Sequence, residues 1–87
     1  MTAHDLTRQP TRSFAIELGF YSGEGEYRVW ESNGFYAGYK PTGGPLLAQE
    51  IGYAMRLPEL ERAENIVRGD ERLKASRIVT SHLAPTV

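Results

Sequence analysis

The chain has 87 residues, with 10 Lys or Arg against 11 Asp or Glu, so its formal charge is −1. A domain that binds nucleic acid through net charge is usually clearly basic, so this balance counts against that class. The absence of cysteine excludes disulfides, thiolate catalysis and cysteine-based zinc sites. With 40% apolar and 24% charged residues, the composition is that of an ordinary globular domain.

The ends and the hydropathy of the chain carry no sign of membrane insertion or export. No apolar run approaches the ~18 residues that a membrane span needs. The start, 1–5, lacks the basic region and the apolar core of a secretory signal. We therefore expect a cytoplasmic protein. Residues 1–12 contain Pro10 and no hydrophobic period, and we expect a flexible N-terminal arm followed by a single compact domain over 13–87.

The first half of the chain reads as three strands. Residues 13–21 alternate apolar side chains with others, which is typical of a strand with one buried face. Residues 26–32 are rich in strand-forming side chains, and Asn33-Gly34 is the common sequence of a type I′ hairpin turn. Residues 35–40 then form the return strand. The pattern predicts a three-stranded antiparallel meander over 13–40.

The second half reads as helical. Pro45 fits the first turn of a helix, and apolar residues recur at helical spacing over 46–57. A second helix follows Pro58 and ends at Gly69. The segment 71–84 is ambiguous: we favour a helix, with a strand over 77–82 as the alternative. The predicted fold is therefore α+β, a three-stranded meander (13–40) packed on one face by two or three helices (45–84).

A turn at Asn33-Gly34 determines which side chains share a face of this meander. Residues opposite one another in a hairpin point the same way, so Trp30 shares a face with Ala37, and Arg28 with Tyr39. A first turn of two or four residues leaves an outer face that carries Tyr21, Arg28, Trp30, Phe35 and Tyr39. It places on the inner face Phe14, Ile16, Leu18, Phe20, Tyr27, Val29 and Tyr36. A three-residue turn buries Trp30 and Phe35 instead.

Both registers leave several aromatic side chains exposed. Three or four of them form a patch of several hundred Å², roughly the size that marks a contact surface. The cover could be another part of the chain, a second copy in a homodimer, or a different protein. We expect a non-enzymatic protein-binding module that acts by steric contact. The expected partner-binding residues are Tyr21, Arg28, Trp30, Phe35 and Tyr39.

The alternative is a small nucleic-acid-binding or transcription-regulatory protein that uses the Arg-rich second half. Its basic surface consists of Arg62, Arg68, Arg72, Lys74 and Arg77. Salt-sensitive binding is the signature of such phosphate contacts. With a formal charge of −1, the electrostatic attraction to phosphates is expected to be weak.

Residues that carry catalytic or cofactor chemistry are sparse. The two histidines, His4 and His82, lie near opposite ends and have no metal-ligand spacing. The glycines of 43–45 precede a predicted helix but lack the lysine of a phosphate-binding loop. We therefore expect no enzyme activity, no cofactor and no metal.

The short, cysteine-free chain with a motif-free aromatic sheet resembles the small proteins of phages and mobile elements, including anti-CRISPR and other anti-defence inhibitors. The resemblance is one of kind, and no residue is assigned from it. It implies an inhibitor, encoded by a phage or mobile element, that blocks a host defence complex.

Overall fold

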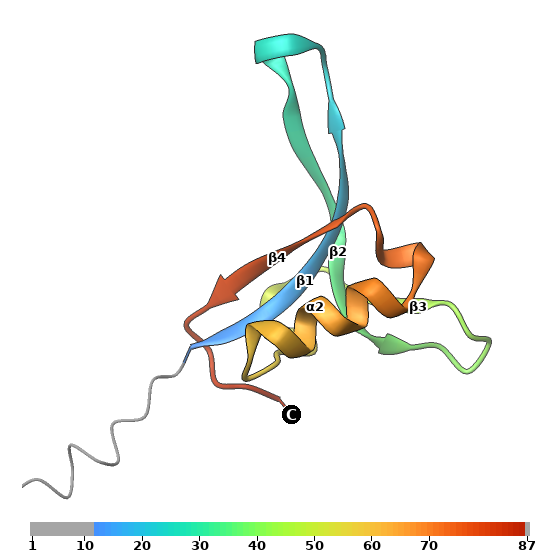
Figure 1. Ribbon diagram of the computed structural model, residues 1–87, viewed down its shortest axis with the longest axis vertical. Helices are drawn as coiled ribbons and strands as arrows, with labels where there is room; N and C mark the ends of the chain where they lie inside the picture. The colour runs from blue at the N-terminus through green and yellow to red at the C-terminus, as the bar shows by residue number, and fades with distance from the viewer. Residues whose placement is uncertain (1–11, 87) are drawn as a thin grey trace, which may run out of the picture.

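The computed structural model describes residues 12–86, which form one sheet and one α-helix (Figure 1). Its strands are β1 (Ser13–Ser22), β2 (Val29–Tyr39), β3 (Pro45–Ala48) and β4 (Ser76–Ser81). The helix is α2 (Leu60–Gly69), and three short 3-10 helices are η1 (Gly25–Tyr27), η2 (Ile51–Tyr53) and η3 (Glu71–Leu73). The expected N-terminal arm lies outside the described residues except for Arg12.

The strands pair antiparallel in the order β3-β2-β1-β4, and α2 crosses one face of this sheet (Figure 1). The α+β class and the antiparallel pairing are confirmed. The expected three-stranded meander over 13–40 with two or three helices over 45–84 is wrong, because the described chain has four strands and one α-helix. Three local features account for the difference.

The first is Asn33-Gly34, which lies inside β2 and makes no turn. The pairing passes from Leu18–Gly34 to Gly19–Ser32, so Asn33 is an extra residue, a β-bulge. Gly34 has φ +127°, whereas no residue other than glycine has a positive φ in the described chain. A type I′ turn needs a positive φ at both central residues, so this backbone excludes it. The turn lies earlier, at 23–28, so the expected opposition of residues across Asn33-Gly34 is wrong, but the bulge still leaves Trp30 and Phe35 on one face of the sheet.

The second is the segment 46–57, which forms β3 and η2 instead of a helix. β3 pairs with β2 at Phe35, Tyr36 and Tyr39, so it covers backbone groups that would otherwise be left on the edge of β2. Proline is tolerated at the start of an edge strand because it has no N–H to contribute to the ladder, and Pro45 occupies that position. Strand pairing thus outweighs the helical spacing of the apolar side chains.

The third is the segment 71–84, where the less favoured strand is found. It forms η3 and then β4, which pairs with β1 from Ser13–Ser81 to Leu18–Ser76. The β-branched residues Ile78, Val79 and Thr80 suit a strand, and the only helix in this part of the described chain is the single turn of η3.

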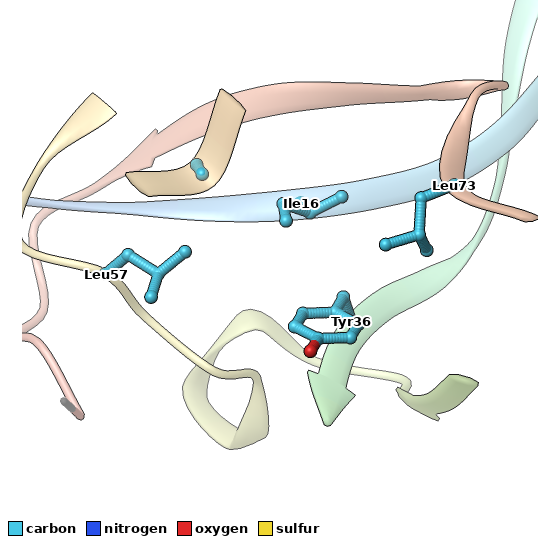
Figure 2. Packing of buried hydrophobic residues seen from close by; sticks show 5 residues of the cluster. Ile16, Tyr36, Leu57 and Leu73 are labelled. Carbon is cyan, nitrogen blue, oxygen red and sulfur yellow. The ribbon is translucent and has the colours of Figure 1, made fainter. Parts of the chain in front are cut away.

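The core lies between the sheet and α2. Its buried side chains come from five separate elements or loops and are Ile16, Tyr36, Leu57, Ala63 and Leu73. Figure 2 shows Ile16, Tyr36, Leu57 and Leu73 directed toward one another. The segment that carries Leu57 links two strands: Met55 N–H donates to the Tyr36 carbonyl (2.9 Å), and Leu57 and Phe14 exchange two backbone hydrogen bonds of 2.8 Å.

The ends of β1 and β2 nearest η1 form a projecting hairpin, residues 19–32, that rises away from the rest of the structure (Figure 1). β4 pairs with β1 only as far as Leu18, and β3 pairs with β2 only from Phe35 onward. The hairpin is therefore two strands wide, and α2 does not reach it. Consequently Phe20, Tyr27 and Val29, which a first turn of two or four residues would place on the inner face, are 52%, 79% and 57% exposed.

Candidate partner-binding surface

Four side chains stack side by side where the projecting hairpin leaves the body. The Arg28 guanidinium lies 4.7 Å from the centroid of the Tyr21 ring. The Tyr21 ring meets Trp30 edge-on, with 5.1 Å between centroids. The Arg77 guanidinium lies 4.6 Å from the Trp30 centroid. We call this set, Arg28, Tyr21, Trp30 and Arg77, the stacked row. Cation–π and edge-to-face contacts of this kind hold the four groups in fixed positions.

The strand register places the stacked row on one face of the sheet. Tyr21 pairs directly with Trp30, and paired residues point to the same side. Between them and the body lies Gly19, which is buried under the Trp30 ring. A Cβ built at Gly19 would lie 2.3 Å from the Glu31 carbonyl oxygen and 2.7 Å from the Trp30 ring. Only glycine therefore allows the indole to lie this close to the sheet.

A carboxylate fixes the inner end of the stacked row. Glu17 is 7% exposed and accepts a hydrogen bond from Arg77 Nε at 2.8 Å. Burial disfavours the charged carboxylate, but hydrogen bonds from Arg77 and Ser32 outweigh it, so the pKa of Glu17 is lowered. The Trp30 indole N–H adds to this effect by proximity, although its geometry gives it no hydrogen-bond acceptor within the described residues. Glu17 thus holds Arg77 over the indole.

The five residues expected to bind a partner do not all come together. Tyr21, Arg28 and Trp30 belong to the stacked row, and half-buried Phe35 pairs with Glu17 on the same face. Tyr39 lies apart: its hydroxyl donates to Asp70 Oδ2 at 2.7 Å, and its ring packs 5.6 Å from Tyr36, a core residue. Tyr39 is separated from the stacked row because β2 has a second irregularity between Tyr36 and Tyr39. Within it, Gly38 has φ +110°.

Arg77 is the member of the stacked row that sequence reasoning left out of the partner-binding set. The sequence places it on the basic surface because it belongs to the Arg-rich second half of the chain. The alternative strand over 77–82 was the one available signal, since it would have allowed Arg77 to lie beside β1. The Glu17–Arg77 pairing across β1 and β4 then places a cation next to the aromatic rings.

The basic residues of the second half do not form one open basic surface. Three of the five are paired with carboxylates: Arg72 with Asp70 (3.0 Å), Lys74 with Glu71 (2.9 Å) and Arg77 with Glu17 (2.8 Å). The other two, Arg62 and Arg68, are exposed on α2. Each pair offsets a positive charge that phosphate binding would use, so the geometry does not favour a nucleic-acid interface.

Residues 12–86 were also searched for a metal site and for a membrane-spanning helix. This part of the chain brings together no three His, Cys, Asp or Glu side chains that could hold a metal ion. None of its helices has both the length and the apolar character needed to cross a bilayer. His82 is exposed just after β4, and His4 lies outside the described residues.

We compared the chain with known proteins, and no family model, curated protein or solved structure matches it. A proposal for its function therefore rests on the contacts described above.

Tyr39 is expected to ionise near pH 12. Its hydrogen bond to Asp70, followed by partial burial, raises the pKa of Tyr39 from 10.0 to about 12. A raised pKa stabilises the fold below the ordinary value of 10.0, and this contribution is lost as the pH rises through about 12. An ultraviolet titration of tyrosine ionisation should therefore show a step near pH 12.

Tyr39→Phe should remove this step, whereas Tyr53→Phe, at an exposed residue, should leave it in place. The same Tyr39→Phe change should raise the pKa of Asp70. That pKa lies below its ordinary range because of hydrogen bonds from Arg72 and, second, from Tyr39. An unchanged Asp70 titration by NMR would show that the Tyr39–Asp70 hydrogen bond is absent in solution.

Proposed function

We propose that this protein is a non-enzymatic module that binds another protein by steric contact through the stacked row. The observation that carries the proposal is the row itself, in which Tyr21 is 55% exposed and the Arg77 side chain 49% exposed. Aromatic and Arg side chains are enriched among the few residues that dominate binding energy at protein interfaces. Here two aromatic rings lie side by side between two Arg side chains on one face of a sheet.

Preorganisation supports this proposal. Each side chain of the stacked row is held by a neighbour: Arg28 by Tyr21, Tyr21 by Trp30, and Arg77 by both Trp30 and Glu17. Ordering a flexible Arg or Tyr on binding costs about 0.5–1.5 kcal/mol per side chain. A surface that is already ordered avoids most of this cost, so more of the contact energy appears as affinity.

The nature of the partner is part of the same proposal. The resemblance to small phage and mobile-element proteins favours a host defence complex as the partner, with inhibition by obstruction in the cytoplasm. A large complex offers flat or concave surfaces to which a projecting hairpin can be applied. The contacts of the stacked row support protein binding, and the defence complex is the hypothesis that the resemblance adds.

The proposal is tested by removing the exposed half of the stacked row. We expect Tyr21→Ala with Arg28→Ala to weaken partner binding by at least tenfold, since interface hot spots contribute about 2 kcal/mol or more. The partner is first captured from lysates of host cells with the wild-type protein, then purified and titrated by calorimetry against each variant. Circular dichroism checks that the variants remain folded.

Tyr53→Ala is the matched control, because Tyr53 is 78% exposed and belongs to η2, outside the projecting hairpin. It should bind like the wild type. Equal affinity for the row variant and the wild type would refute the proposal, and so would an equal loss in both variants.

A further inference from the structure

A groove of about 300 Å³ lies between α2 and the segment 55–57 that precedes it. Its apolar walls are Met55 and Leu57 from the segment and Ile66 from the helix, and all three side chains belong to the core cluster or pack against it. Arg62 and Asn65 of α2 complete the lining. The groove is thus apolar on both walls, and its polar side chains come from the helix alone.

The two polar side chains of the groove supply hydrogen-bond donors. Arg62 makes no ion pair within residues 12–86, and a guanidinium has donors and no acceptor. The Asn65 carbonyl oxygen accepts a hydrogen bond from the Arg68 guanidinium, which leaves the amide N–H groups of Asn65 to donate. The described lining contains no carboxylate. A group that binds beside these donors must accept hydrogen bonds, and a negative charge favours it.

The backbone beside the groove is already paired, so an added peptide strand does not fit there. Leu57 exchanges two hydrogen bonds with Phe14, and the N–H and carbonyl of Arg56 are both bonded to Thr86. The N–H of Met55 donates to β2. These hydrogen bonds also hold this wall in place. A preformed groove of about 300 Å³ has the size of the smaller sites for small molecules, so we take a small molecule as its occupant.

We propose that the groove binds a small carboxylic acid with an apolar chain, of the size of octanoate. The chain lies against Met55, Leu57 and Ile66, where binding removes apolar surface from water. The carboxylate lies on the helix side and accepts hydrogen bonds from the Arg62 guanidinium and the Asn65 amide, which are strong when the acceptor is charged. The site goes beyond the proposed function, because none of its lining residues belongs to the stacked row.

Binding is tested by titrating octanoate into the protein with isotope-labelled methionine methyl groups and recording NMR spectra. Met55 lines the groove, and its signal is identified by its loss in Met55→Leu. We expect this signal to shift until the site is saturated, with a dissociation constant below about 1 mM. Acetate lacks the chain, and octylamine carries a cation in place of the carboxylate, so neither should saturate the site over the same concentrations.

Arg62→Gln and, separately, Asn65→Asp should each raise the dissociation constant of octanoate at least tenfold. The first change removes the cation, and the second places a like charge beside the bound carboxylate. Both side chains are exposed, so the variants should fold, which circular dichroism checks. Arg28→Gln is the matched control: it removes a cation from the stacked row and should bind octanoate like the wild type.

Three results would each overturn the proposal of a carboxylate site in the groove. They are the absence of a saturable shift with octanoate, equal binding of octylamine, and wild-type affinity for octanoate in both groove variants. None of them would affect the proposed function, because partner binding is measured separately and should be the same in Arg62→Gln as in the wild type.

Discussion

Gly19→Ala is expected to lower the free energy of unfolding by about 2–3 kcal/mol, at the upper end of overpacking costs. The added methyl would lie 2.3 Å from the Glu31 carbonyl oxygen, which belongs to the paired strand and cannot move aside without breaking the ladder. It would also displace the Trp30 ring, from which it is separated by 2.7 Å. Urea denaturation measures the loss.

Trp30 is the only tryptophan in the chain, so its fluorescence reports on the same site. The emission of folded Gly19→Ala should shift to longer wavelength as the indole moves into water. Gly52→Ala is the control, because its methyl would meet only Leu83, at an ordinary 3.9 Å. If both variants unfold at the same urea concentration as the wild type, the Trp30 ring does not lie against Gly19 in solution.

Leu73→Ala is expected to cost about 2–5 kcal/mol, the range for a large apolar side chain removed from a core. Leu73 is fully buried in η3 and packs in the same cluster as Ile16 and Tyr36 (Figure 2). Through this side chain η3 is attached to the core, and η3 leads directly into β4. A cavity here therefore weakens both the core and the attachment of the last strand.

Thermal and urea denaturation of Leu73→Ala should be compared with Leu60→Ala, which removes the same atoms from a position that is 45% exposed. We expect the exposed variant to lose less than about 1 kcal/mol. Similar losses in the two variants would contradict the placement of Leu73 in the core.

Local sequence signals predicted β1, the α+β class and the helix that ends at Gly69. These signals gave the wrong structure where one local sequence pattern is compatible with two different backbone structures. Asn33-Gly34 fits both a turn and a bulge, since each uses a glycine with positive φ, and only the pairing of β2 with β1 on both sides of it distinguishes them. The segment 46–57 has helical spacing, but the open edge of β2 recruits its first part as β3.

The candidate site could be predicted in part for the same reason. Tyr21, Arg28 and Trp30 were recognisable because aromatic residues and a cation crowd a short strand-rich stretch. Arg77 was not, because its position depends on β4, which pairs with a strand 60 residues earlier. Tyr39 was misplaced because the irregularity at Gly38 has no distinct sequence pattern.

The pairing of β1 with β4 has a consequence for how the chain reaches this fold. β1 is the first described strand, and its Ser13 hydroxyl donates to the Leu83 carbonyl, 70 residues later. The hairpin of β1 and β2 is a local structure and can form early, whereas β4, the second neighbour of β1, is synthesised only after the intervening strands and the helix. Until then the whole length of β1 is an open template for aggregation, and contacts of such long sequence separation slow folding. Prompt pairing of β4 with β1 therefore protects this protein more than the early formation of its hairpin.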